Sequence, residues 1–127
     1  MFLFKRKKET PPTPSAEPQR PQPKVLDGIR YSTDTARKYS VTPEETAFFE
    51  AFDAALRAAG KSTYYKTTRM ADGVLSVSSS RAYLGKIKLQ GKKTRMQYEK
   101  RGGNFTALEG GTLEQYIDLL SYWVRTA

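Results

Sequence analysis

Four cations with a regular spacing lie in the middle of the chain. Lys86 and Lys88 alternate with uncharged residues before Gly91, and Lys93 and Arg95 do so after it. Because successive side chains of a strand point to opposite faces, this alternation predicts a β-hairpin with one apolar and one basic face. Such a basic face could contact two or three consecutive phosphates, with salt-dependent and largely sequence-independent binding. We therefore take Lys86, Lys88, Lys93 and Arg95 as candidate residues for binding nucleic acid or another polyanion.

These cations also have a second interpretation. Lysines on the exposed face of a sheet hinder aggregation and keep a protein in solution without binding any ligand. Against this, like charges opposite one another across strands cost up to about 1 kcal/mol, so Lys88 facing Arg95 favours a bound polyanion. Alternation further places Tyr83 and Tyr98 on the apolar face and only Tyr65 on the open one, which argues against a platform for base stacking. The sequence leaves both interpretations open.

Most kinds of catalysis are excluded by composition. The chain contains no cysteine and no histidine, so thiol nucleophiles, histidine bases and thiolate or imidazole metal sites have no residues to build them. The strongest remaining arrangement is a Mg²⁺-dependent nuclease that uses Asp72, Glu99 and Lys100. Asp72 is better explained by a turn with Gly73, and Glu99 alone lacks the second carboxylate that such sites use. We expect no enzymatic activity, no cofactor and no metal.

The net charge of +9 is unevenly distributed along the chain. Residues 81–101 contain eight Lys or Arg and one Glu, a net charge of +7, and residues 1–24 contain six and two, a net charge of +4. The rest of the chain is close to neutral or acidic. A basic surface of this kind indicates an anionic partner rather than a particular fold.

The N-terminus begins with three apolar residues followed by four cations. This stretch is too short for a signal peptide or a transmembrane span. It could press against an anionic membrane, where each cation near the surface adds about 1 kcal/mol. The alternative is an ordinary solvated basic terminus. We expect a cytoplasmic protein, and the residues for peripheral membrane contact would be Phe2, Leu3, Phe4, Lys5, Arg6, Lys7 and Lys8.

Composition divides the chain into three parts. Residues 1–24 hold six of the seven prolines and almost no core-forming side chain, which predicts a disordered basic and proline-rich linker. Residues 25–41 predict an extended arm, and whether residues 25–31 form a short strand stays open. Residues 42–127 carry all the long periodic patterns and predict one domain.

Two helices flank the predicted hairpins. Thr42, Pro43 and Glu45 form a capping box with proline at the first helical position, which predicts a helix from Pro43 to about Ala59. Thr112 and Gln115 form a second capping box, which predicts a helix that runs to the end of the sequence. Both carry apolar residues at three- and four-residue spacings, so each has one buried face.

The strands between them predict two hairpins. In the first, residues 63–70 and 74–79 flank Asp72–Gly73, a two-residue turn that would set Met70 opposite Leu75 and place Arg69 on the open face. In the second, a turn at Gly91 would set Ile87 opposite Met96 and Gly85 opposite Tyr98. Arg69 is therefore the fifth candidate residue for a polyanion.

The pattern as a whole predicts the α+β class: a helix, a four-stranded antiparallel sheet made of two hairpins, and a C-terminal helix, with both helices on one face of the sheet. The favoured function is a small non-enzymatic binding module that contacts nucleic-acid phosphates through its basic hairpin. The alternative is a protein-interaction or adaptor domain of unidentified partner, tethered to an anionic membrane by its N-terminal residues.

Overall fold

The first long element is helix α2, Pro43–Ala58, in a computed structural model that describes Leu26 and residues 28–127. Its start is the predicted capping box: the Thr42 hydroxyl accepts from the Glu45 backbone, and the Glu45 carboxylate accepts from the Thr42 backbone. These two contacts satisfy amide groups that a helix N-terminus would otherwise leave unpaired.

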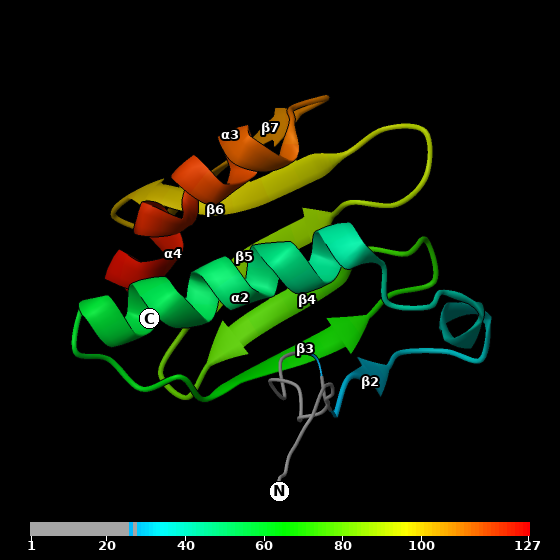
Figure 1. The fold of residues 1–127 in the computed structure, drawn as a ribbon, viewed down its shortest axis with the longest axis horizontal. Coiled ribbons are helices and arrows are strands. Elements are labelled where there is room, and N and C mark those ends of the chain that lie inside the picture. Colours follow the sequence, from blue (N-terminus) through cyan, green and yellow to red (C-terminus); the bar gives the residue numbers. More distant parts are fainter. Residues whose placement is uncertain (1–25, 27) are drawn as a thin grey trace, which may run out of the picture.

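A six-stranded sheet lies behind this helix (Figure 1). Its order follows the chain, and every neighbouring pair is antiparallel except β2 and β3. The α+β class is confirmed, but the predicted four strands fall two short, because a strand is added at each edge. The strands are β2 Arg30–Tyr31, β3 Tyr65–Arg69, β4 Leu75–Ser79, β5 Tyr83–Lys88, β6 Arg95–Arg101 and β7 Asn104–Glu109.

The C-terminal segment forms two short helices rather than one. Helix α3, Leu113–Asp118, begins at the predicted Thr112–Gln115 capping box, and α4, Leu120–Thr126, follows after Leu119. All three helices lie on the same face of the sheet, with α2 over β3 to β5 and the C-terminal pair over β5 and β6 (Figure 1). None of the described α-helices lies on the other face of the sheet, and we call it the open face.

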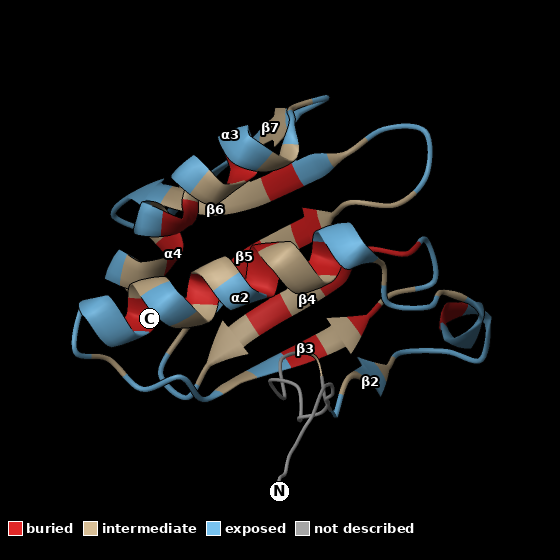
Figure 2. Ribbon diagram, viewed as in Figure 1, coloured by how far each residue is buried: buried red, intermediate tan, exposed pale blue. Residues whose placement is uncertain are grey.

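The core lies between the helices and the sheet, where the buried positions of α2 face those of the strands (Figure 2). Trp123 on α4 is fully buried and makes edge-to-face contacts with Phe48 and Phe52 of α2, at ring-centroid distances of 5.5 and 5.4 Å. Aromatic pairs in this geometry contribute about 0.5–1.5 kcal/mol each beyond the area that they bury. The single tryptophan thus joins α2 to α4.

The first hairpin corrects the predicted register. Arg69 pairs with Leu75, so the turn holds Ala71, Asp72 and Gly73 rather than two residues. The Gly73 amide donates to the Met70 carbonyl, and Gly73 has a φ of 92°, the left-handed conformation that closes three-residue hairpins. A shift of one residue moves a whole strand's side chains to the other face. The predicted open-face positions of Tyr65 and Arg69 are therefore wrong, because both lie on the helical face of the sheet.

In the second hairpin the predicted register is confirmed near the turn, where Ile87 pairs with Met96 and Lys88 with Arg95. Further from the turn, the predicted pair of Gly85 and Tyr98 is not part of the β5–β6 ladder. Gly85 lies beside the indole of Trp123, which donates to the Gln97 carbonyl at 2.9 Å. A Cβ on Gly85 would lie 2.0 Å from that carbonyl oxygen, so only glycine fits this position.

Candidate nucleic-acid interface

The open face gathers cations from four strands. Cross-strand pairing places Lys86 beside Ser76, Ser76 beside Thr68, and Thr68 beside Arg30. Paired residues share a face of the sheet, so the predicted cations meet others that the sequence interpretation did not include. The open-face cations of the strands are Arg30, Lys66, Lys86, Lys88 and Arg95.

Two of the predicted cations have an acidic neighbour. Lys93 and Arg95 lie 3.6 and 3.8 Å from the carboxylate of Glu109 on β7, and all three side chains are about half exposed or more. Exposed ion pairs contribute little to stability, but Glu109 lowers the local repulsion between Arg95 and Lys88. Lys86 and Lys88 make no ion pair with any residue that the structure describes. They are the more available pair for an anionic ligand.

Arg69, the fifth candidate, is not on this surface. Its side chain is fully buried, and its guanidinium donates to both carboxylate oxygens of Glu45 at 2.6 and 3.1 Å and to the Gly73 carbonyl at 3.0 Å. Gln90 also donates to Glu45, at 3.1 Å. The prediction that Arg69 extends the polyanion site is wrong, because the three-residue turn directs it into the interior. It holds the N-terminus of α2 against the sheet instead.

An irregularity in β5 brings an aromatic ring to the open face. Ser78 pairs with Tyr83 while Val77 pairs with Gly85, so Leu84 is an extra residue with no partner in the ladder. Such a β-bulge breaks the alternation of side chains. Leu84 is fully buried, whereas Tyr83 is 37% exposed, which reverses the faces expected for both residues. Alternation alone carried no signal of this bulge.

Tyr83 and Phe105 form an aromatic pair on the open face. Their ring centroids are 5.5 Å apart with the planes inclined by 45°, and Phe105 on β7 is 40% exposed. The Tyr83 hydroxyl donates to the Gln97 side chain at 2.7 Å, which fixes the ring. Partial burial raises the pKa of Tyr83, while the Ser76 hydroxyl and the charge of Arg95 act in the opposite direction. Tyr83 therefore stays neutral, within the field of a cation of the same face.

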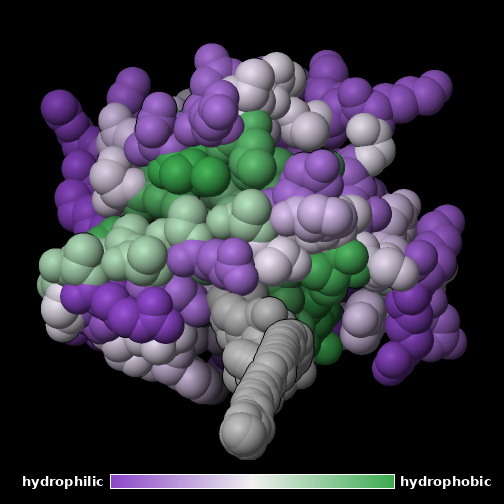
Figure 3. Space-filling view, viewed as in Figure 1, coloured by the Kyte–Doolittle hydropathy of each residue, from purple (hydrophilic) through white to green (hydrophobic). Residues whose placement is uncertain are grey.

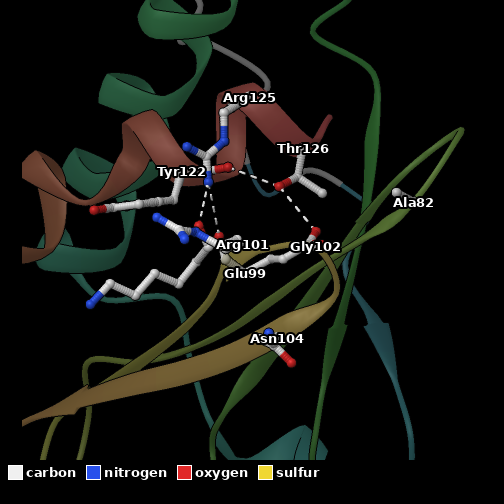
Figure 4. Close-up of a pocket in the computed structure, with 9 residues that line it drawn as sticks. Ala82, Glu99, Arg101, Gly102, Asn104, Tyr122, Arg125 and Thr126 are labelled. Atoms are coloured by element: carbon white, nitrogen blue, oxygen red, sulfur yellow. Dashed lines mark hydrogen bonds between the residues drawn. The ribbon is translucent and has the colours of Figure 1, made fainter.

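A second basic site lies where β6 ends. A pocket there is lined by Lys100, Arg101 and Arg125 together with Ala82 and Asn104, the chain neighbours of Tyr83 and Phe105 (Figure 4). The Arg125 guanidinium donates to the Lys100 carbonyl at 2.8 Å and stacks over the Tyr122 ring at 5.1 Å. These contacts hold Arg125 in place beside Lys100 and Arg101, and Glu99 lines the same pocket.

The residues considered for a nuclease do not converge. Asp72 accepts from the Val74 backbone in the β3–β4 turn, and Glu99 accepts from the Gly103 backbone in the β6–β7 turn. Within the described residues, no group of three acidic, histidine or cysteine side chains could hold a metal ion.

The helical face differs from the open face in having an apolar groove. Between α2 and the C-terminal helices, apolar side chains gather at the surface (Figure 3), and the groove is lined by Ala51, Ala55, Ile117 and Val124 among others. At one end, the Lys61 ammonium donates to the carbonyls of Val124 and Ala127 at 2.7 and 3.1 Å.

The candidate membrane-contact residues, Phe2 to Lys8, lie outside the described residues. Over the part of the chain that the structure does describe, no helix is both long and apolar enough to cross a bilayer. In comparisons with protein-family models, with curated proteins and with solved structures, the chain matches none.

Proposed function

We propose that this protein is a non-enzymatic nucleic-acid-binding module whose open face contacts phosphates. The observation that carries this proposal is the position of Lys86 and Lys88, neighbouring cations without an acidic partner in the described chain, on a face that none of the described helices covers. Arg30, Lys66 and Arg95 extend the same charge across the sheet. A surface of this kind binds phosphates because it displaces counterions from them.

The open face also supports binding by its polar composition. Thr68, Ser76 and Ser78 lie between the cations, and Gln97 lies beside them on β6. Hydroxyl and amide groups donate to phosphate oxygens and position a nucleic acid without reading its sequence. The favoured ligand is therefore a sugar–phosphate backbone rather than a particular base sequence.

Replacing Lys86 and Lys88 by Gln tests this function. With two phosphate contacts removed, the slope of log K against log salt falls by about 1.8 for duplex or about 1.4 for a single strand. We expect affinity for a random-sequence oligonucleotide to fall about tenfold at low salt. Fluorescence anisotropy at several salt concentrations, with DNA and RNA probes, measures both quantities. Lys93→Gln should weaken binding less, because Glu109 already partners it.

The matched control is Lys38→Gln with Arg57→Gln, which removes the same charge from outside the open face. Equal affinity losses in the two double variants would show that net charge, and not the position of Lys86 and Lys88, determines the affinity. No loss in the Lys86/Lys88 variant would refute the proposed site.

A protein-interaction or adaptor domain is the second candidate, and the apolar groove between α2 and the C-terminal helices favours it. A partner that buries this groove would be sensitive to Ala55→Glu and indifferent to Lys86 and Lys88. The two candidates thus use opposite faces of the molecule.

A further inference from the structure

The aromatic pair on the open face is the feature that the phosphate contacts leave unexplained. Few large apolar side chains of the described chain are exposed, and Tyr83 and Phe105 are the two that touch each other. They come from β5 and β7, on either side of β6, so the pair exists only because the sheet brings them together. An aromatic surface exposed on a sheet costs solubility unless it has a partner.

The Tyr83 ring is held before any ligand arrives. The bulge at Leu84 turns it to the open face, and its hydroxyl is bound to the Gln97 side chain. Gln97 is itself anchored, because its backbone carbonyl accepts from Trp123 in the core. A ring that is fixed in advance loses little conformational freedom on binding. Its flat surface is therefore available to another flat group.

Cations share the open face with the pair. Lys86 on β5 and Arg95 on β6 lie on this face, whereas the pocket of Lys100, Arg101 and Arg125 at the end of β6 is partly formed by α4, on the helical side. From Arg95 to Arg101 the strand β6 spans roughly 20 Å at about 3.4 Å per residue. This length matches a few nucleotides of an extended strand.

We propose that the open face takes single-stranded nucleic acid, with bases stacked on Tyr83 and Phe105 and phosphates bound by Lys86 and Arg95. The inference rests on the proposed function and adds the class of nucleic acid. In a duplex the base faces are covered by neighbouring pairs, so exposed rings on a sheet select unpaired bases. Stacking is tolerant of sequence, because every base has a π-face.

The test compares single-stranded DNA and RNA of ~12 nucleotides with a duplex of the same length, using the full chain. Tyr83→Leu with Phe105→Leu keeps apolar bulk but removes both rings. We expect it to weaken single-strand binding about tenfold for each ring and to leave duplex binding unchanged. Tyr83→Phe keeps the ring and should retain most of the affinity. DNA and RNA should respond alike, because stacking does not read the 2′-hydroxyl.

The outcomes separate this inference from the proposed function. If Lys86→Gln with Lys88→Gln weakens both ligands while the ring variant binds single strands as the parent does, the phosphate site stands and the stacking platform is refuted. If neither Lys nor ring substitutions change any affinity, both fail. Thermal unfolding followed by Trp123 emission checks the fold. If the double leucine variant unfolds, Phe105→Leu alone, on the exposed edge strand β7, tests the platform: unchanged single-strand affinity in this folded variant would refute stacking on Phe105.

Discussion

Arg69 and Glu45 are the residues in which charge is most deeply buried. Both side chains are almost fully inaccessible and joined by two hydrogen bonds, and Glu45 also caps α2. Removing one partner of a buried pair leaves an uncompensated charge, which costs far more than the pair contributes. One carboxylate thus connects the helix start, the first hairpin and the loop at Gln90.

Glu45→Gln should therefore lower the free energy of unfolding by about 3–5 kcal/mol, because Arg69 stays charged and buried. Urea denaturation followed by Trp123 emission measures the change. The control is Glu44→Gln, an exposed neighbour, with an expected change of about 0.5 kcal/mol or less. Combining Glu45→Gln with Arg69→Met should recover part of the loss. A stable single variant would contradict this role for the ion pair.

At the scale of elements, β3 is held to α2 by Tyr65. Its hydroxyl donates to the Asp53 carboxylate at 2.7 Å, and its ring packs against Phe52 at a centroid distance of 4.8 Å. Burial raises the pKa of Tyr65 far above its ordinary value of 10.0, and the hydrogen bond and charge of Asp53 act in the same direction. The folded state therefore keeps this proton at pH values where the unfolded chain loses it.

The sign of the pH dependence follows from this difference. Below pH 10 the folded and unfolded states both hold the Tyr65 proton, so its contribution to the free energy of unfolding is complete. Above pH 10 only the unfolded state releases the proton, and the free energy of unfolding falls. At about pH 11 the parent should have lost about 1.4 kcal/mol more than Tyr65→Phe, relative to about pH 8. Urea denaturation of both proteins at the two pH values checks this. Parallel losses in the two proteins would contradict it.

Elements with local signals could be predicted from sequence. The two capping boxes mark the starts of α2 and α3, and Lys88 opposite Arg95 follows from alternation around Gly91. The residues assigned to the wrong face have another cause. The face of Arg69 is set by one extra residue in the turn, and the face of Tyr83 by one unpaired residue in β5. The extra turn residue and the bulge each shift the alternation of side chains by one position, and neither alters the pattern of apolar residues in the sequence.

For the same reason, only part of the face assignment of the candidate residues could be predicted. Lys86, Lys88 and Arg95 lie on the open face, because they are close to the predicted turn. Phe105 lies on β7, an edge strand that the sequence patterns did not predict and that is exposed along most of its length. The wrong face for Tyr83 and the missing strand β7 thus concealed the arrangement that favours base stacking.

At the scale of the whole molecule, the charge is concentrated in two regions, the N-terminal residues and the basic hairpin. The full chain should float with anionic vesicles at low salt more than a version lacking residues 1–24, since each of Lys5 to Lys8 adds about 1 kcal/mol near an anionic surface. Flotation beside neutral vesicles measures it. Equal flotation of the two proteins would exclude the tether, and the Lys86/Lys88 variant shows what the sheet itself contributes.

Gln97 serves both faces of the sheet at once. Its carbonyl accepts from the only indole of the chain, in the core, and its side chain accepts from Tyr83, on the open face. The unlabelled protein therefore contains an optical reporter two hydrogen bonds from the surface where a ligand would lie. The emission of Trp123 depends on the peptide carbonyl of Gln97, the residue whose side chain anchors Tyr83, so we expect that occupancy of the open face can be followed without attaching a dye.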